Sequence, residues 1–286
     1  MATTGGPDGT FERETASQPD GDGRTAELPE RWLTPWGQVN GGFAAGVAVR
    51  GAVDAAAPHL PASATVQFLR PVRAGAARLV LDVLWTGDRT MATRVTMVQG
   101  GEDVLVAMVW TVERSEALEH HVAPPPDLPE PDIMATVPEL LAEEGLPVLP
   151  LWDTVDVRPT AWVSQLAPPR RDPVETGWIR VLPPARLDDP GVTVAAAFVL
   201  VDMTVVFPVW HPHGVDPITS GFAPMTLDLA AQFFDVTPGG PWLRQQSAAP
   251  VATRGLVGGR ASLWSPDGRL VAFGIGQMML RPPPPA

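Results

Sequence analysis

The sequence feature that most restricts the fold of this chain is an internal repeat. Residues 255–281 hold two apolar runs around Ser265-Pro266-Asp267-Gly268, and Pro, Asp and Gly in succession are typical of a β-hairpin turn. Residues 93–114 repeat the order of strand, Gly-rich turn and apolar strand, and Leu105-Val106-Ala107 matches Leu270-Val271-Ala272. Two copies are too few for a solenoid, so the repeat predicts two similar halves fused in one chain.

Each half has the pattern of one helix followed by four strands. In the first half, Asn40 is a good N-cap and Pro58 a stop signal, so the apolar residues between them predict a helix. In the second half, residues 191–207 are rich in β-branched side chains, which favours a strand, but their position in the repeat favours a helix. We predict the helix, and we expect the strands of both halves to form one continuous sheet.

The segments outside the repeat have other sequence patterns. We expect residues 1–9 to be disordered and residues 10–15 to form a short strand that opens an N-terminal half spanning 10–114. Residues 115–150 are acidic and rich in Pro, which predicts a linker on the surface with a short helix at 137–143. The C-terminal half then spans residues 151–286, and its strand 270–281 carries small residues on one face that would let a helix approach.

The composition excludes several classes of protein. The 286 residues include no Cys and no Lys, which removes disulfides, thiolate zinc sites, lysine Schiff bases and P-loops. A net charge of −12 argues against nucleic-acid binding. The chain lacks a G-x-S-x-G elbow and a signal-peptide pattern, and Asp202 and Pro208 interrupt its most apolar stretch, 191–210. We therefore expect a cytoplasmic protein that does not span a membrane.

Four polar residues stand in apolar or strand-like surroundings. Asp202 is the charged residue within 191–210, and a lone buried carboxylate costs several kcal/mol unless it is partnered. Thr226 and Asp228 share a parity in the alternating run 225–233, and Gln277 replaces the apolar Val112 of the first copy. Each has a plainer interpretation as well: a solvent-facing acid, an ordinary polar strand face and a structural amide.

Two further features allow more than one interpretation. Gly41 and Gly42 offer backbone N–H groups at a helix N-terminus, where an oxyanion would be stabilised, or they only permit close packing. His211 and His213 would need a third ligand to hold a metal ion. We predict no metal and no cofactor.

A helix wrapped by a curved antiparallel sheet, repeated once, is the α+β architecture of a double hotdog. The motifs that support a family resemblance are Asn40-Gly41-Gly42, Phe68-Leu69-Arg70-Pro71, Pro266-Asp267-Gly268-Arg269-Leu270-Val271-Ala272, Gln277 and Leu280-Arg281. In this order and spacing, from about residue 30 to 281, the chain resembles the bacterial acyl-CoA thioesterase II group of double-hotdog thioesterases. The resemblance implies that Asp202, Thr226 and Gln277 are catalytic.

The resemblance also implies a function in lipid metabolism, the hydrolysis of acyl-CoA to free acid and CoA. Asp202, Thr226 and Gln277 would then hold the attacking water, and Gly41, Gly42 and Asp228 would contact the substrate. Asp228 competes with Asp202 as the base, and Arg70, Arg73 and Arg89 are either CoA contacts or surface charges. A homo-oligomer is left open. The alternatives are a non-catalytic acyl-thioester or fatty-acyl binding protein, or a dehydratase or hydratase acting on a pathway-bound acyl group, although the sequence shows no His-Asp dyad typical of hydratases.

Overall fold

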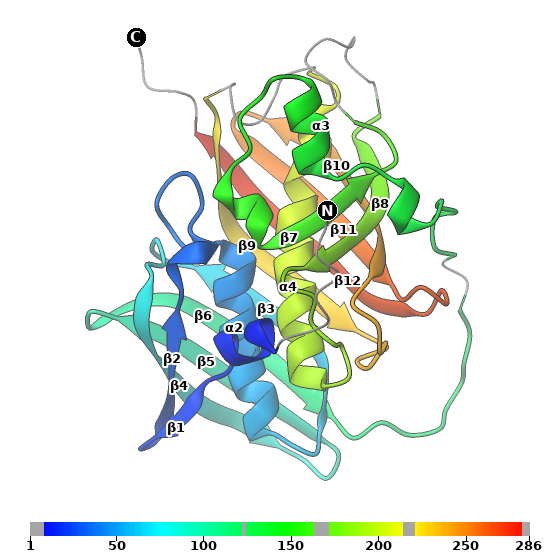
Figure 1. Ribbon diagram of the computed structural model, residues 1–286. Helices are drawn as coiled ribbons and strands as arrows, with labels where there is room; N and C mark the ends of the chain where they lie inside the picture. Colours follow the sequence, from blue (N-terminus) through cyan, green and yellow to red (C-terminus); the bar gives the residue numbers. More distant parts are fainter. Residues whose placement is uncertain (1–8, 122–123, 163–171, 214–220, 282–286) are drawn as a thin grey trace.

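Two long helices lie side by side inside one curved sheet in the computed structural model (Figure 1). The structure describes residues 9–121, 124–162, 172–213 and 221–281, and within these ranges twelve antiparallel strands form the sheet. The helices are α2 (Gly41–Ala55) and α4 (Pro190–Val206), so the predicted second helix is confirmed. The fold is the predicted double hotdog.

The strand order repeats in the two halves. The strands of the first half are β1 (Gln18–Asp20), β2 (Gly23–Leu28), β3 (Leu60–Phe68), β4 (Gly75–Thr86), β5 (Thr90–Gln99) and β6 (Glu102–Val112). Those of the second half are β7 (Val155–Pro159), β8 (Val174–Val181), β9 (Ala223–Phe233), β10 (Leu243–Thr253), β11 (Leu256–Trp264) and β12 (Leu270–Arg281).

The two halves meet edge to edge. The sheet order is β1-β2-β4-β5-β6-β3-β9-β12-β11-β10-β8-β7, which is symmetric about the β3–β9 pair. β3 and β9 pair antiparallel with Thr65 opposite Ala230, so equivalent strands of the two halves join as they would in a two-fold dimer. The predicted continuous sheet is confirmed.

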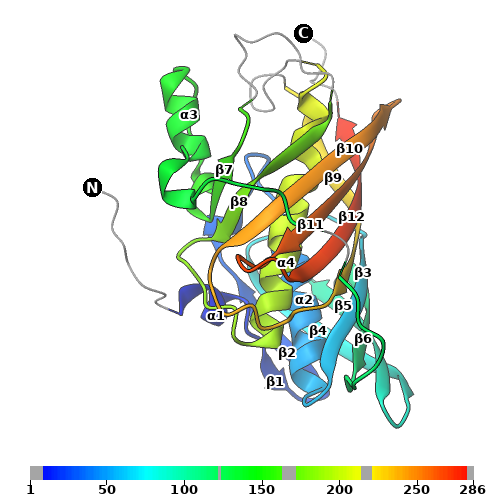
Figure 2. The same ribbon diagram turned by 90° about the vertical axis from the view of Figure 1, so that its right-hand side faces the viewer.

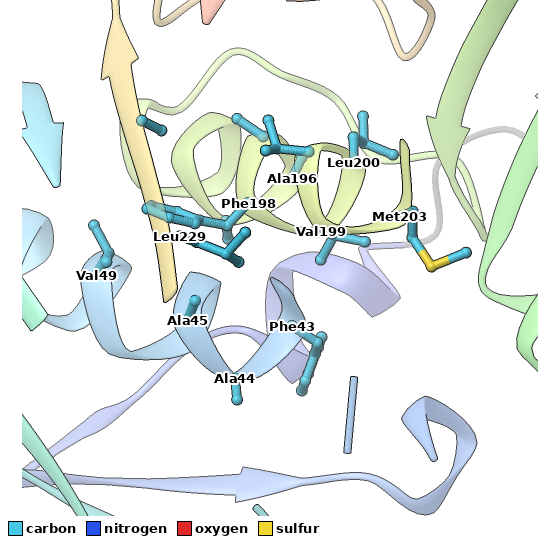
Figure 3. Packing of buried hydrophobic residues seen from close by; sticks show 14 of the residues in the cluster. Phe43, Ala44, Ala45, Val49, Ala196, Phe198, Val199, Leu200, Met203 and Leu229 are labelled. Atoms are coloured by element: carbon cyan, nitrogen blue, oxygen red, sulfur yellow. The ribbon is translucent and has the colours of Figure 1, made fainter. Parts of the chain in front are cut away.

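The helices α2 and α4 approach closely because α2 carries glycine at the contact. A Cβ on Gly42 would lie 2.6 Å from Asp202 Cβ and 2.8 Å from Val199 Cα, and a Cβ on Gly46 would lie 2.8 Å from the backbone oxygen of Ala195. Figure 3 shows Val199 of α4 turned toward α2. The glycines of α2 therefore bring the two helix backbones together.

Helix α4 is the central core element. Its N-cap is Asp189, whose Oδ1 accepts a hydrogen bond of 2.9 Å from the N–H of Val192, and Pro190 occupies the first turn. The helical stretch Pro190–Trp210, which includes η4 (Phe207–Trp210), is long and apolar enough to cross a membrane, but 94% of the apolar window is buried inside the protein. This burial is what the core helix of a hotdog requires.

The first described residues form a helix, so the predicted strand at 10–15 is wrong. Helix α1 (Thr10–Glu14) begins after Gly9, whose φ of 71° is easily adopted by glycine. Phe11 is fully buried and its ring lies 6.0 Å from that of Trp32 in η1 (Glu30–Trp32). One helical turn buries this single aromatic side chain without a partner strand. Residues 1–8 of the predicted disordered segment lie outside the described residues.

The predicted surface linker is partly buried. Its helix α3 (Val137–Glu143) lies where it was predicted and starts with a capping box formed by Thr136 and Glu139. Val137 and Leu141 are buried, as is Trp152 in η3 (Pro150–Asp153), whereas η2 (Pro131–Ile133) is not. In Figure 2, α4 runs between α3 and β12. Although this segment is acidic and rich in Pro, it contains an apolar pair at positions i and i+4 that packs against the core.

Candidate functional site

Asp202 lies near the C-terminal end of α4, 6% exposed, and accepts three hydrogen bonds. Its Oδ2 accepts from the N–H of Gly42 at 2.8 Å and from Nδ2 of Asn40 at 3.1 Å, and its Oδ1 accepts from the hydroxyl of Thr226 at 2.9 Å. These donors replace part of the hydration that the carboxylate loses on burial. The solvent-facing interpretation of Asp202 is therefore wrong.

The N-terminus of α2 supplies two of these partners. The first N–H groups of a helix have no partner within the helix and carry its positive partial charge. The N–H of Gly42 donates to Asp202, while the N–H of Phe43 donates to Oδ1 of the N-cap Asn40 at 2.9 Å. Because the N–H of Gly42 is engaged by Asp202, it does not serve as the free oxyanion donor that the sequence suggested.

Burial dominates the protonation of this carboxyl group. It raises the pKa of Asp202 above the ordinary value of 3.8, and the hydrogen bonds from Gly42, Thr226 and Asn40 oppose that rise only in part. A carboxylate with a raised pKa accepts protons more readily than an exposed one. Asp202 is thus suited to act as a base.

A β-bulge in β9 decides which face Thr226 occupies. Gln277 pairs with Asp228, but the next residue, Met278, pairs with Thr226, so Leu227 is an extra residue in the ladder. Thr226 faces α4, whereas Asp228 falls on the outer face with Ala230 and Gln232. The prediction that Thr226 and Asp228 share a face is wrong for this reason.

Gln277 lies on the outer face of the sheet. It is exposed and opposite Asp228, and the residues of β12 that face α4 are its neighbours of the other parity. A Cβ on Gly274 would lie 2.7 Å from Cγ1 of Val201, and one on Gly276 would lie 3.4 Å from Cγ2 of Val205. The small face of β12 admits the helix as predicted, but the same alternation keeps Gln277 away from Asp202.

A cavity of about 390 Å³ opens beside Asp202 and Thr226. A stripe of residues along α4, η4 and the position after η4 lines one side of the cavity. This stripe consists of Asp202, Met203, Val206, Phe207, Trp210 and His211. Gly41 and Asn40 line the cavity at the start of α2, and α3 and η3 supply an apolar wall that includes Leu141 and Trp152. The cavity has the mostly apolar lining that suits a hydrocarbon tail.

The sequence interpretation missed two parts of this site. Asn40 was recognised as a helix cap, but nothing in a single N-cap residue indicates that its amide also reaches a carboxylate 162 positions away. The wall from α3 and η3 was treated as linker. Its signal in the sequence was the i, i+4 pair Val137 and Leu141 inside an acidic segment.

The opposite ends of the two helices do not repeat the site. When the N-caps Asn40 and Asp189 are matched, Val53 takes the position of Asp202. The neighbouring Asp54 meets the start of α4, but its Oδ2 lies 3.5 Å from Nε of Arg50. That carboxylate is ion-paired and does not line the cavity, so the two halves are not equivalent at this position.

Arginines and histidines complete the surroundings. Arg70 and Arg281 line the cavity, and Arg70 forms an ion pair of 2.7 Å with Glu102. Arg89 lies 3.8 Å from Glu113, and neither it nor Arg73 lines the cavity. No group of three or more His, Asp or Glu side chains in the described residues could hold a metal ion.

Comparison with known families gives a match over most of the chain. The family model of the acyl-CoA thioesterase N-terminal domain matches residues 28–112, and that of the acyl-CoA thioesterase C-terminal domain matches residues 124–280. Among curated protein sequences, none matches this chain.

Solved structures share the fold. A conserved protein of unknown function with a hot dog fold from Alicyclobacillus acidocaldarius has a TM-score of 0.80 at 22% identity, covering 96% of this chain and 98% of that one. The acyl-CoA thioesterase II TesB2 from Mycobacterium marinum has a TM-score of 0.73 at 20% identity, with 96% and 99% covered. The dehydratase domain of PpsC from Mycobacterium tuberculosis, in complex with C12:1-CoA, has a TM-score of 0.54 at 14% identity, with 94% and 99% covered.

Proposed function

The chain belongs to the acyl-CoA thioesterase family, and from this we propose that it hydrolyses acyl-CoA with Asp202 as general base. The observation that carries the proposal is the buried Asp202 carboxylate, hydrogen-bonded to the hydroxyl of Thr226 at the wall of an apolar cavity. Such a site joins a proton acceptor to a space for an acyl tail.

The proposed reaction uses a water held between Asp202 and Thr226. The Thr226 hydroxyl donates its hydrogen to Oδ1 of Asp202, which leaves the lone pairs of the hydroxyl free to accept a hydrogen bond from water. As the water oxygen attacks the carbonyl carbon, its proton passes to Asp202 and the C=O electron pair moves to oxygen. Collapse of the tetrahedral intermediate breaks the C–S bond, and the departing CoA sulfur takes the proton back from Asp202.

The developing oxyanion needs hydrogen-bond donors. Gly41 lines the cavity at the first position of α2, where backbone N–H groups point out of the helix. We assign its N–H to the carbonyl oxygen, beside the N–H of Gly42 that holds Asp202. In this arrangement, one helix N-terminus stabilises both the base and the oxyanion.

CoA is placed at the rim in this proposal. Arg70 and Arg281 lie on the cavity lining at strand ends that flank β9, where a guanidinium can meet a phosphate bidentately. Arg70 would exchange its pairing with Glu102 for a phosphate of CoA. The acyl tail then extends along the apolar stripe of α4.

A panel of acyl-CoA substrates with detection of the released thiol tests this function. We expect CoA release from the wild-type protein and a loss of about 10²–10⁴-fold in kcat/KM for Asp202→Asn. Asp228→Asn tests the competing carboxylate, and we expect it to retain activity because Asp228 lies on the outer face. Thr226→Val should lower activity and Thr226→Ser should retain it.

Other outcomes would assign the site differently. Tight binding of acyl-CoA without thiol release would identify a binding protein, and full activity of Asp202→Asn would remove Asp202 as the base. A 3-hydroxyacyl-CoA in the panel tests dehydration, since the enoyl product absorbs in the ultraviolet.

A further inference from the structure

A second group of polar side chains is buried away from Asp202, where β8 and β10 pass under the end of η4. This polar cluster consists of Glu175, His211, Gln245 and Ser247, of which His211, Gln245 and Ser247 are 2%, 0% and 1% exposed. Nε2 of His211 lies 3.5 Å from Oε2 of Glu175, and Nε2 of Gln245 donates to Oε1 of Glu175 at 3.4 Å. Ser247 is the direct cross-strand partner of Glu175, so their side chains share the inner face.

The polar cluster is incompletely hydrogen-bonded. Nδ1 of His211, Oε1 of Gln245 and Oγ of Ser247 have no hydrogen-bond partner in the part of the chain that the structure describes, and the same holds for Nε1 of the adjacent Trp210. Buried polar atoms in native proteins are nearly always partnered, and each exception needs an explanation. Two of these atoms, Nδ1 of His211 and Nε1 of Trp210, belong to side chains that line the cavity, and unpartnered buried polar atoms at such a place suit a polar guest.

The polar cluster opens into the same cavity as Asp202. Glu175, Trp210 and His211 all line that cavity. Asp202 and His211 are nine residues apart on the continuous path of α4 and η4, which corresponds to about 14 Å along the helix axis. Apolar residues of the same stripe, such as Val206, lie between them. A bound molecule would therefore meet a polar site, an apolar stretch and a second polar site in succession.

We propose that the polar cluster binds a hydroxyl group on the acyl chain, remote from the thioester, so that hydroxylated acyl-CoA is the preferred substrate class. This inference rests on the proposed function for the identity of the reacting end. A hydroxyl both donates and accepts, which matches cavity-lining groups that include an acceptor, the carboxylate of Glu175, and a donor, Nε1 of Trp210. A carboxylate guest would face the acidic Glu175 at low dielectric, and an ammonium guest would have to give up its hydration.

The test compares chains of equal length with and without a hydroxyl. Free fatty acids are titrated calorimetrically and the corresponding acyl-CoAs are assayed by thiol release, with the hydroxyl moved stepwise along the distal part of the chain. We expect a chain hydroxylated at one particular position to bind about tenfold or more tighter than the plain chain, and to raise kcat/KM by the same factor. The plain chain leaves the polar cluster without a hydrogen-bonding partner. Equal values at every position would overturn the proposal.

Matched variants on β10 assign the effect to the polar cluster. Gln245 donates a hydrogen bond to Glu175 and Ser247 is the cross-strand partner of Glu175, so Gln245→Leu and Ser247→Ala should disturb Glu175 and reduce the preference for the hydroxylated chain to near onefold. Gln246→Leu, the same change at the exposed neighbouring position, should retain it. If Gln245→Leu does not fold, the smaller change Ser247→Ala still decides, and an unchanged preference in that variant contradicts the proposal.

The two proposals fail in distinguishable ways. If no acyl-CoA is hydrolysed, the proposed function is wrong, but the calorimetric comparison of free acids still measures the role of the polar cluster. If hydrolysis is normal and indifferent to the hydroxyl, the proposed function stands and the polar cluster holds only water.

Discussion

The burial of Asp202 opposes the ionisation of its carboxyl group. Burial raises its pKa, so the folded carboxyl group holds its proton at pH values where the unfolded one has lost it. Between the unfolded and the folded pKa, the native state therefore binds more protons, and the free energy of unfolding falls as the pH rises through this window. A residue that costs stability at neutral pH is expected at a functional site, where activity and stability are in conflict.

Asp202→Asn should therefore make the protein more stable at neutral pH while removing activity. The neutral amide avoids the burial of a charge, and its oxygen can still accept from the N–H of Gly42. We expect a higher melting temperature than the wild type at pH 7 and a difference that shrinks as the pH falls toward 3.8, where the wild-type carboxyl is protonated. A variant that is less stable at pH 7 would mean that the hydrogen bonds outweigh the cost of burial.

The pH profile of the reaction should report the same group. Because the base must be unprotonated, kcat/KM should decrease on the acidic side with an apparent pKa above the ordinary 3.8 of an Asp. Steady-state kinetics between pH 4 and 8 measure this acidic decrease in kcat/KM. Circular dichroism first establishes the pH range in which the protein stays folded. An acidic limb at or below the ordinary value would argue that Asp202 is not the titrating base.

At the scale of elements, the contact between α2 and α4 creates the site. Gly42 and Gly46 are one turn apart on the face of α2 that meets α4, and this close contact brings the N-terminus of α2 to Asp202. Ser, Ala or any larger residue at position 42 would separate the helices at the point where the N–H of Gly42 donates to the carboxylate. Helix packing and the proposed catalysis therefore depend on the same glycine.

Gly42→Ala should lower both stability and activity. The added Cβ would lie 2.6 Å from Cβ of Asp202 and 2.8 Å from Cα of Val199, distances that require the helix backbones to shift. We expect a loss of about 1–3 kcal/mol in the free energy of unfolding, measured by chemical denaturation, and a lower kcat. Gly258→Ala on β11, where nothing lies within 4 Å of the added Cβ, is the matched control. Equal stability of the two variants would contradict this account.

At the scale of the molecule, each half completes the other. The site takes Asn40 and Gly42 from the first half and Asp202 and Thr226 from the second. The sheet is continuous only through the β3–β9 pair, and α2 buries its glycine face on α4. The chain therefore has the arrangement of a hotdog dimer within a single chain, with two halves that differ at the site.

The separate halves should not fold into stable monomers. A fragment of residues 1–114 exposes the edge of β3 and the apolar face of α2, both of which the second half covers. We expect size-exclusion chromatography to show association or aggregation, and thermal melts to lack the cooperative transition of the full chain. Mixing with residues 115–286 should restore thiol release. A cooperatively unfolding monomer of residues 1–114 would show that the halves are independent.

The sequence by itself determined the order of elements and the continuity of the sheet. Helix caps, turn residues and the repeat are local signals, and a repeat transfers the interpretation of one half to the other, which is how the β-branched α4 was recognised as a helix. Asp202 was singled out because a lone carboxylate in apolar surroundings needs a partner, whereas the choice of Thr226 rested on the family resemblance. Those signals depend on a residue and its near neighbours, so they can be read without the fold.

The tertiary structure alone decided the faces and the distant contacts. Side chains alternate with a period of two along a strand, so the single extra residue Leu227 reverses the face of everything beyond it, and strand pairing determines where that bulge forms. The bulge puts Asp228 on the outer face, and the alternation along β12 puts Gln277 there as well. Glu175, His211, Gln245 and Ser247 are scattered over 72 positions of the sequence, and only the packing of β8 and β10 beneath η4 brings their unpaired atoms together.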